Sequence, residues 1–450
     1  MSVEFRTYLL SEIASKITKG TTPSKKDGGF SESGINYIKA ESVGFDGRID
    51  RSKFAFISED VHHKLKRSQL EVNDILFSMA GVHLGKVALV EEQHVPANTN
   101  QALALIRPIT SLVNPLYLLY FLQQREVVHF VNNAISQSAQ PNINLKQIGD
   151  LEIRLPELAV QNKVVDILSS LDRKLVINTD INQNLENIAQ AIFKSWFVDF
   201  DPVKAKMNGE QPEGMDASTA SLFPEKLVES ELGLIPEGWS VEEAKSQLDV
   251  LRGFSYKGKG LVGSLDKGVP MHNLNSVLEG GGYKYAGLKF YSEEFKEKFA
   301  IKEGDVLVAN TEQGHNHLLI GYGAMVPKHL AHGFFSHHTY RVRPKKNSNV
   351  TPEFIERLFG KGRFVRQVQG FTNGTTVNML PVAGMEMPQF VVPSKALAQK
   401  FSELVKPMKA MIEENHKSNI ELAKLRDTLL PKLLSGEIEL GQAQELAEVE

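Results

Sequence analysis

One loop of this chain resembles a site for nucleotide phosphates. The segment Gly81-Val-His-Leu-Gly85-Lys86 has the glycines and the lysine of a phosphate-binding loop. It is one residue too short, and Val87 stands where such a loop needs Ser or Thr to hold Mg²⁺. We therefore do not expect this loop to bind a nucleotide.

Histidines are concentrated near the middle of the second half, where the sequence contains His315, His317, His329, His332, His337 and His338. A zinc site needs convergent ligands with orienting partners, and Glu312 is the one carboxylate close to the first of these histidines. Polar surface or DNA contact is the better interpretation. No catalytic dyad or triad can be identified. We therefore expect this chain to carry no catalytic residue, metal ion or cofactor.

Polar loops offer chemistry of another kind. Lys and Arg bind phosphates, whereas Asn, Gln, Ser and Thr hydrogen-bond to base edges. Turn chemistry and solvated surface remain alternatives for every such loop. In the first half the candidates for DNA contact are Lys19, Thr21, Thr22, Lys25, Lys26, Lys39, Ser78, Gln140 and Asn142. In the second half they are Arg252, Lys257, His272, Asn273, Asn310, Thr311, Gln313, His337, His338, Asn373 and Thr375.

Two long helices must position these loops. Residues 158–198 contain no Pro or Gly, and their apolar side chains recur in steps of four and three, as in a coiled-coil seam. The same pattern returns later in the chain at a constant offset, and two asparagines interrupt each seam at equivalent places. The predicted seam comprises Val164, Leu168, Leu171, Leu175, Asn178, Asn182, Leu185, Ile192, Phe401, Val405, Met408, Ile412, Asn415, Asn419, Leu422 and Leu429. Matched polar interruptions favour a duplicated unit, whose helices pack on each other, over two unrelated amphipathic helices.

The segments that precede the two helices also resemble each other. Val72-Asn-Asp-Ile-Leu is similar to Glu303-Gly-Asp-Val-Leu, and Asn114-Pro115 is matched by Thr351-Pro352 at the offset of the helices. We expect the proline at 115 to open a helix that runs to about Asn132. The predicted fold class is α+β: two similar α/β domains separated by two long helices in an antiparallel coiled coil, with a pseudo-two-fold internal repeat.

This repeat predicts an order of six parts along the chain. They are a first domain (1–155), a first long helix (156–198), a central connector (199–236), a second domain (237–393), a second long helix (394–436) and an acidic C-terminal tail (437–450). The connector is rich in Pro, Gly and acids, so it is either a surface-bound connector or a flexible linker.

Composition limits the possible functions. The net charge is −3, yet the first domain carries 17 Lys and Arg against 16 Asp and Glu, and the second carries 19 against 15. Each domain can therefore present a basic face to DNA. The sequence has no apolar run of about 18 residues, so we expect no membrane span. The absence of Cys excludes disulfides. The N-terminus lacks the layout of a signal peptide, so we expect a cytoplasmic protein.

Two similar domains on a helical spacer suit a ligand that has two sub-sites. DNA presents such sub-sites along one face at intervals of one helical turn, about 34 Å. Domains that have diverged would read different half-sites, and the length of the helices would set the spacing.

The quoted motifs carry a resemblance to a known family. The repeat layout resembles the DNA specificity subunit of type I restriction-modification enzymes. Phe197-Val-Asp-Phe-Asp-Pro-Val, Leu234-Ile-Pro-Glu-Gly-Trp239 and Leu429-Leu-Pro-Lys-Leu-Leu-Ser-Gly-Glu437 are similar to that family's central region and C-terminal helix end. The similarity extends over nearly the whole chain.

The resemblance implies a role in a larger complex. Each domain is then a target-recognition domain that reads half of an asymmetric, bipartite site in double-stranded DNA. The helices would dock two modification subunits, which bind S-adenosylmethionine and methylate adenine. Two restriction subunits would add ATP- and Mg-dependent translocation and cleavage. The specificity subunit itself would have no active site, and the central connector would be a docking segment.

Two other interpretations remain open. A single-chain restriction-methyltransferase would need a catalytic segment upstream of the first domain. A coiled-coil scaffold that binds only proteins would have no DNA preference.

Overall fold

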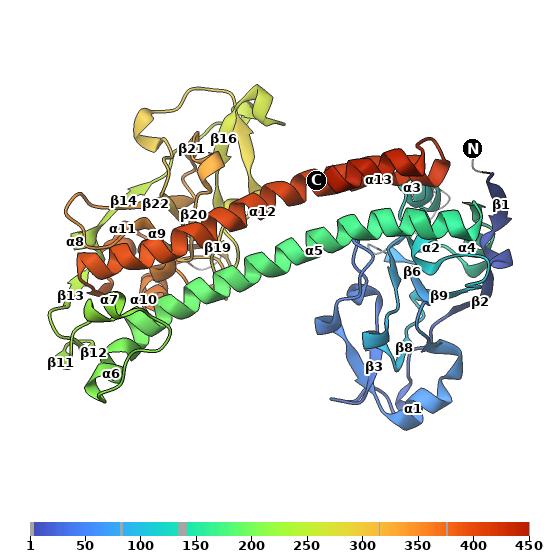
Figure 1. Cartoon of the computed structure of the whole chain (residues 1–450), viewed down its shortest axis with the longest axis horizontal. Coiled ribbons are helices and arrows are strands. Elements are labelled where there is room, and N and C mark those ends of the chain that lie inside the picture. Colours follow the sequence, from blue (N-terminus) through green and yellow to red (C-terminus); the bar gives the residue numbers. More distant parts are fainter. Residues whose placement is uncertain (1–3, 82–83, 134–141, 315, 375–376, 450) are drawn as a thin grey trace. The chain divides into compact units, whose positions relative to one another are not determined.

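The computed structural model describes the chain except for residues 1–3, 82–83, 134–141, 315, 375–376 and 450. Two compact units are present (Figure 1). Unit 1 comprises Met1–Ile177 and Ser418–Glu450, and unit 2 comprises Asn178–Lys417. None of the helices in the described ranges is long and apolar enough to cross a membrane.

The described strands of unit 1 form three sheets. A four-stranded sheet has the order β2-β9-β6-β7, a second has the order β4-β3-β8-β5, and β1 pairs with β10. The neighbouring strands β3 and β8 run parallel, with Tyr37 opposite Asn98, and the other pairs are antiparallel. The strands are β1 (Arg6–Leu9), β2 (Ala14–Lys19), β3 (Ile35–Ile38), β4 (Ala55–Ile57), β5 (Gln69–Leu70), β6 (Ile75–Ser78), β7 (Val87–Leu89), β8 (Ala97–Thr99), β9 (Leu103–Pro108) and β10 (Glu152–Leu155).

Strand β6 is buried on both faces of its sheet. Ile75 and Phe77 face a core made with the helices, whereas Leu76 faces a separate core made with the second sheet. Successive strand side chains point to opposite faces. This explains why β6 is a continuous apolar run rather than an alternating one.

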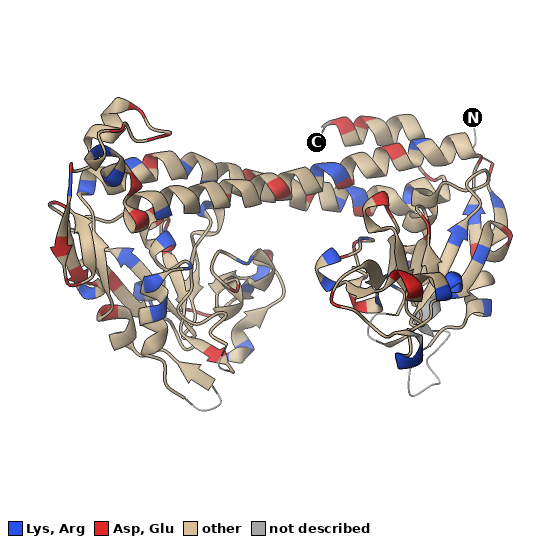
Figure 2. Ribbon diagram, turned by 90° about the horizontal axis from the view of Figure 1, so that it is seen from below, with Lys and Arg blue, Asp and Glu red and all other residues tan. Residues whose placement is uncertain are grey.

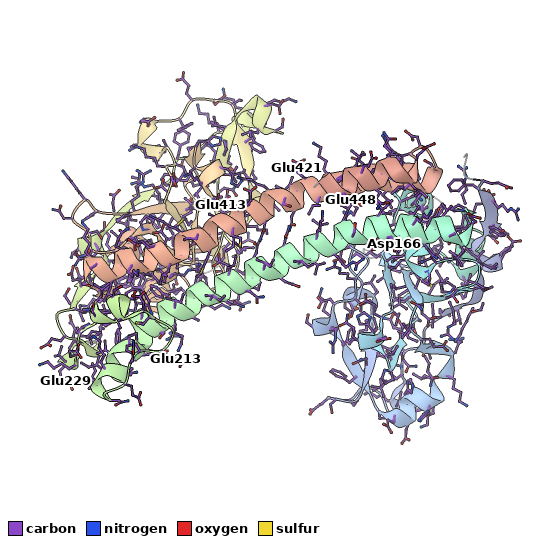
Figure 3. All side chains as sticks on the ribbon, viewed as in Figure 1. Asp166, Glu213, Glu229, Glu413, Glu421 and Glu448 are labelled. Carbon is purple, nitrogen blue, oxygen red and sulfur yellow. The ribbon has the colours of Figure 1, made fainter. Side chains whose placement is uncertain are left out.

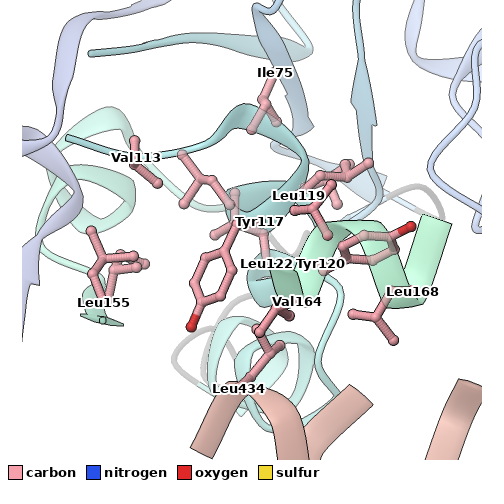
Figure 4. Close-up of a cluster of buried hydrophobic side chains, with 14 of the residues drawn as sticks. Ile75, Val113, Tyr117, Leu119, Tyr120, Leu122, Leu155, Val164, Leu168 and Leu434 are labelled. Atoms are coloured by element: carbon pink, nitrogen blue, oxygen red, sulfur yellow. The ribbon is translucent and has the colours of Figure 1, made fainter. Parts of the chain in front are cut away.

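Most helices of unit 1 share a core with its first sheet. They are α2 (Pro115–Leu122), α3 (Arg125–Asn133), α4 (Leu145–Gly149), the first part of α5 (Leu158–Lys194), the last part of α12 (Lys395–Ser435) and α13 (Leu440–Val449). Tyr117 and Tyr120 of α2 meet Val164 and Leu168 of α5, and Leu434 of α12, in the buried cluster of Figure 4. Helix α1 (Glu59–Lys64) instead packs on the second sheet through Val61.

Unit 2 repeats this arrangement. Its four-stranded sheets have the orders β14-β22-β18-β20 and β15-β17-β16-β21, and β13 pairs with β24 as β1 does with β10. Again one pair in the second sheet is parallel, β16 with β21. Two further pairs, β11 with β12 and β19 with β23, stand apart from these sheets. The strands are β11 (Leu227–Ser230), β12 (Gly233–Pro236), β13 (Ser240–Glu243), β14 (Leu248–Arg252), β15 (Leu261–Val262), β16 (Val269–His272), β17 (Lys289–Tyr291), β18 (Val306–Ala309), β19 (Thr311–Gln313), β20 (Gly323–Met325), β21 (Phe334–Phe335), β22 (Thr339–Pro344), β23 (Val377–Met379) and β24 (Gln389–Val392).

Three helices of unit 2 lie at the places that α2, α3 and α4 take in unit 1. They are α9 (Pro352–Leu358), α10 (Arg363–Gly370) and α11 (Val382–Glu386). Unit 2 also contains α6 (Asp201–Met207), α7 (Ala217–Ser221), α8 (Ala244–Gln247), the last part of α5 and the first part of α12. A side chain caps the proline-started helix in both units. Asn114 accepts from the backbone N–H of Leu116, and Thr351 accepts from that of Phe354.

An ion pair in each first sheet also follows the repeat. Arg107 of β9 donates from Nε and Nη2 to the two carboxylate oxygens of Asp74, at 2.8 and 2.9 Å. Arg343 of β22 makes the same two-point contact with Asp305. Each carboxylate also accepts from the backbone N–H three residues earlier in the chain. Both aspartates are buried, so the arginine satisfies a charge that the fold has removed from water.

Within each unit the two long helices pair antiparallel. In unit 1, Arg426 Nη1 donates to Asp172 Oδ1 at 3.0 Å, and Asn419 Nδ2 lies 3.5 Å from the carbonyl oxygen of Leu175. In unit 2, Asn415 Nδ2 donates to Asn182 Oδ1 at 2.8 Å. The apolar seam positions Val164, Leu168, Leu171, Leu422 and Leu429 are buried in unit 1, as are Phe401 and Val405 in unit 2, while Leu175, Leu185, Ile192, Met408 and Ile412 are half-buried.

Paired long helices and two similar α/β units confirm the predicted fold class. One helix differs from expectation. The helix expected from Asn114 to about Asn132 is two helices, α2 and α3. They separate at Gln124, whose N–H bonds to Phe121 at the end of α2 and whose carbonyl accepts from Val128 in α3.

The connector and the tail carry regular structure. The connector, residues 199–236, contains α6, α7 and the β11–β12 hairpin, and it buries Phe200, Val203 and Phe223 in the core of unit 2. The tail, residues 437–450, contains α13, which buries Ala443 and Ala447 in the core of unit 1. Its described acidic side chains, including Glu448 (Figure 3), are exposed. Both segments therefore pack on a core despite their acidic composition.

Candidate nucleic-acid interface

The polar loops of unit 1 start where one strand crosses another at close range. Strand β2 ends at Lys19, and Gly20 then passes over the end of β8. A Cβ atom on Gly20 would lie 2.2 Å from the carbonyl oxygens of both Thr99 and Asn100. The Gly20 N–H donates to Leu103 at 3.1 Å, and the Thr21 N–H donates to Thr99 at 2.9 Å. Only glycine fits this crossing.

Polar side chains surround this crossing. Lys19, Thr22, Lys25 and Lys26 are exposed. The Tyr37 hydroxyl donates to the carbonyl oxygen of Thr21 at 2.9 Å and so holds the loop. Burial raises the pKa of Tyr37 to about 12, which keeps this donor protonated at neutral pH.

Arg67 also belongs to this surface, although sequence reasoning missed it. Its Nη2 donates to Thr21 Oγ1 at 3.1 Å, and its side chain is exposed. The residue lies in the 3₁₀ turn Lys66–Ser68, 46 positions from Thr21. Nothing in the local sequence distinguishes Arg67 from its neighbours.

The other four candidates of unit 1 differ in their surroundings. Lys39 is half-buried, with its ammonium 5.3 Å from the centre of the Phe30 ring and 3.7 Å from Glu41. Ser78 is fully buried, so its hydroxyl has no surface to offer DNA. Asn142 is exposed and bridges to Ala80. Gln140 lies outside the described residues.

Unit 2 has the same crossing. Strand β14 ends at Arg252, and Gly253 passes over the end of β21. A Cβ atom there would lie 2.1 Å from the carbonyl oxygen of Ser336. The Gly253 N–H donates to Thr339 at 3.1 Å, and the Phe254 N–H donates to Phe335 at 2.9 Å. These bonds match those of Gly20 and Thr21.

Five predicted residues of unit 2 meet at this crossing. The carbonyl oxygen of His337 accepts from Asn310 Nδ2 at 3.0 Å and lies 3.4 Å from Arg252 Nε. Thr311 Oγ1 lies 3.2 Å from His338 Nδ1, and the rings of the two histidines are 3.9 Å apart. The structure therefore brings together residues that are distant in the chain, such as Arg252 and His337, which lie 85 positions apart.

The residues of this cluster differ in exposure. The exposed side chains are available for contact with DNA, and the buried ones support them. Arg252 and His338 are exposed and His337 is half-buried, whereas Asn310 and Thr311 are buried beneath them. Partial burial, with the neighbouring His337 and Arg252, lowers the pKa of His338. His338 is therefore neutral at neutral pH, and its ring offers a hydrogen bond rather than a positive charge.

The remaining candidates of unit 2 do not join the cluster. His272 is fully buried, with Nδ1 2.9 Å from the Tyr283 hydroxyl and Nε2 3.1 Å from the carbonyl oxygen of Leu330. Asn273 is buried and caps the turn Leu274–Ser276. Both side chains hold the fold and present no surface to DNA. Lys257, Gln313 and Asn373 are exposed, and Thr375 lies outside the described residues.

The surfaces of both units carry mixed charge. Both signs of charge occur on each unit (Figure 2), so neither unit is uniformly basic. Within the described ranges, no three His, Asp or Glu side chains are grouped so that they could hold a metal ion. What the two crossings present is a set of hydrogen-bonding groups and isolated cations.

Comparisons with known proteins agree with this architecture. The family model described as the type I restriction modification DNA specificity domain matches residues 2–187. The HindI specificity subunit of a type I restriction enzyme of Haemophilus influenzae is 25% identical over 419 residues, which cover 83% of this chain and 88% of the relative. The MjaIX specificity subunit of Methanocaldococcus jannaschii is 26% identical over 376 residues, covering 80% and 76%.

A solved structure shows the same fold. The crystal structure of the type I restriction-modification system S subunit from M. genitalium aligns with a TM-score of 0.54 at 13% sequence identity, covering 96% of each chain.

Proposed function

Because this chain belongs to the family of specificity subunits of type I restriction-modification enzymes, we propose that it selects the DNA sequence on which such a complex acts. Unit 1 reads one block of a bipartite, asymmetric site, and unit 2 reads the other. The observation that carries the proposal is the repeated strand crossing at Gly20 and Gly253, which supports polar loops in both units.

The parts of the chain then have separate tasks. Residues 1–155 and 237–393 are the target-recognition domains, and residues 156–198 and 394–436 are the spacer helices. Residues 199–236 dock partner subunits, and residues 437–450 form the C-terminal tail after the second repeat. The Asn182–Asn415 hydrogen bond supports a fixed helix register, because a polar pair in an apolar seam disfavours other alignments.

DNA contact follows from the chemistry of the exposed groups. Lys19, Lys25 and Lys26 bind phosphates near the crossing of unit 1, and Arg252 does so in unit 2. Thr22, His337 and His338 hydrogen-bond to base edges. Lys19 and Arg252 lie on strand ends, and the backbone bonds of the crossings hold the loops beside them, so little backbone freedom is lost there on binding.

Partner subunits supply the reactions. Two modification subunits bind S-adenosylmethionine and methylate adenine, and two restriction subunits use ATP and Mg for translocation and cleavage. This chain contributes recognition and assembly and no catalytic group. The complex acts in the cytoplasm, where it meets its DNA.

Methylation profiling tests this function. Long-read sequencing of DNA from cells that express this chain with its modification subunit should show one methylated motif of two short blocks and a constant gap. Replacing residues 237–393 with those of a relative should change one block only.

Two other results would contradict this assignment. A change in both blocks would mean that the units do not each read one block. A stable complex without methylation, and without selection of a discontinuous sequence from random DNA, would favour a protein scaffold.

A further inference from the structure

Unit 2 contains an apolar pocket that DNA recognition does not use. Its volume is about 400 Å³, and it lies between the end of α5, helices α9 and α10, and strands β12 and β24. Its floor is formed by buried phenylalanines: Phe193, Phe197, Phe354, Phe364 and Phe390. Two apolar side chains at its edge are exposed to solvent, Val198 by 54% and Leu234 by 53%.

The described charged side chains that line this pocket are all positive. They are Lys194, Arg357, Lys361, Arg363 and Arg366. Lys194 pairs with Asp199, Arg357 pairs with Glu186, and Arg363 Nη1 donates to the carbonyl oxygen of Leu232 at 3.1 Å. Lys361 and Arg366 are exposed, and neither forms an ion pair with a described residue. Two cations at the rim are thus available to a ligand.

Two glutamines of the wall satisfy each other's hydrogen bonds. Gln367 and Gln389 bond to each other, with Gln367 Nε2 donating to the carbonyl oxygen of Gln389 at 2.9 Å and Gln367 Oε1 accepting from its N–H at 3.1 Å. A ligand therefore meets an apolar floor, a cationic rim and one buried donor, Arg357 Nε, that has no hydrogen-bond partner among the described residues.

The internal repeat provides a comparison within the same chain. At the positions of the repeat that correspond to Lys361, Arg363 and Arg366, unit 1 has Gln124, Glu126 and His129. The phenylalanines at 354 and 364 are matched by Tyr117 and Val127. The fold of this region recurs in unit 1, but its rim cations and most of its aromatic floor do not. The pocket is therefore a property of unit 2 and not of the repeated fold.

We propose that this pocket docks an amphipathic segment of a protein partner whose apolar side chains are flanked by carboxylates. Apolar side chains of the segment cover Val198 and Leu234 and enter between the phenylalanines. Its carboxylates meet Lys361 and Arg366. Charge complementarity selects the acidic segment, and burial of the exposed apolar edge supplies affinity.

DNA and lipid fit the same surface less well. Phosphates would satisfy the cations but would leave the apolar floor open to water. A free fatty acid has one carboxylate and would leave one of the two cations without a counter-charge. The inference rests on the proposed function in one respect: the partner used to test it is the modification subunit.

The test measures binding of the purified full-length chain to the modification subunit by calorimetry. The double variant Lys361→Glu and Arg366→Glu should bind about ten-fold more weakly at low salt, and the difference should shrink as salt rises. The variant Leu234→Ser removes apolar contact area without adding a charge, so it should weaken binding to a similar extent at low and at high salt. Lys346→Glu, an exposed cation of unit 2 outside the pocket, is the matched control and should bind normally.

Hydrogen exchange of the same complex provides a second measurement. Residues 193–200 and 361–367 should gain protection when the modification subunit is bound, and residues 124–130 of unit 1 should not.

Each alternative outcome contradicts a different statement. Unchanged affinity in both pocket variants would overturn the inference and leave the proposed function intact. Failure of the unaltered chain to bind the modification subunit would overturn the proposed assembly, and the inference with it. Loss of DNA affinity by the double variant, with normal subunit binding, would assign the surface to DNA and overturn the docking proposal.

Discussion

Replacing Gly253 by Ala tests whether the strand crossing determines the site of unit 2. The new methyl carbon would lie 2.1 Å from the carbonyl oxygen of Ser336 and 2.4 Å from its carbonyl carbon. These are backbone atoms, so the two chains must move apart. Separation breaks or stretches the bonds from Gly253 to Thr339 and from Phe254 to Phe335.

The expected loss of stability follows from these contacts. Two backbone hydrogen bonds contribute about 2 kcal/mol together. Overpacking adds about 1–3 kcal/mol, and the reduced freedom of the unfolded chain returns less than about 1 kcal/mol. We expect the free energy of unfolding of unit 2 to fall by about 3 kcal/mol. For a unit of this size, the melting temperature should fall by about 6–12 °C.

Gly258→Ala is the matched control. Gly258 lies further along the same loop, and a Cβ atom there has no neighbour within 4 Å. The free energy of unfolding of the Gly258→Ala variant should change by less than about 0.5 kcal/mol. Differential scanning calorimetry of the full chain measures both variants. Methylation profiling should show that Gly253→Ala weakens selection at one block and leaves the other unchanged. If the melting temperature of Gly253→Ala lies within about 2 °C of that of Gly258→Ala, the loss of stability is too small for a steric clash, and the argument is refuted.

Individual contacts elsewhere in the chain are also testable. Arg252→Ala should weaken DNA binding and lower the slope of log affinity against log salt by about 0.9, without changing the melting temperature; a fluorescence-anisotropy titration across salt concentrations measures this, and an unchanged slope would remove Arg252 from the phosphate contacts. The double variant Lys25→Ala and Lys26→Ala should weaken DNA binding through unit 1 and lower the slope of log affinity against log salt by about twice as much. Lys53→Ala, which removes a cation already paired with Asp50, is the control. Burial lowers the pKa of His272 from 6.5 to about 4. Its contribution to stability is therefore complete above pH 6.5 and is lost as the pH falls toward 4, by about 3 kcal/mol. Denaturant unfolding at several pH values should show this loss, and His272→Gln should reduce it; an equal pH dependence in both would contradict the assignment. Leu429→Ala, a buried seam position, should cost about 2–5 kcal/mol, whereas Ile420→Ala on the exposed face of the same helix should cost less than about 1 kcal/mol; similar losses would mean that the seam is wrongly placed.

The sequence by itself determined the repeat and the helices. Apolar spacing does not depend on distant contacts, because each helix must bury one stripe of its own surface. The constant offset between the two seams placed Asn182 and Asn415 among the seam residues, and their side chains are hydrogen-bonded in unit 2. Proline and capping residues likewise marked the starts of α2 and α9.

Burial of polar side chains was decided only by the tertiary structure. His272 and His337 both follow short apolar segments, yet one is enclosed by Tyr283 and Leu330 while the other lies at the crossing. The sequence predicts Ser78 as a candidate for DNA contact, yet its side chain is enclosed in its sheet. The environment of such a residue comes from elements that are distant in the chain, so its own neighbours in the sequence carry no record of it.

Convergence of distant residues was likewise a property of the folded chain. Arg67 reaches Thr21 across 46 positions, and the cations of the unit 2 pocket come from α5 and from the α9–α10 region, with most of the second domain between them in the sequence. The sequence contains these side chains and even the glycines that permit the crossings. Which of them meet depends on strand pairing and helix packing, and those are set by the summed burial of the whole core rather than by any local pattern.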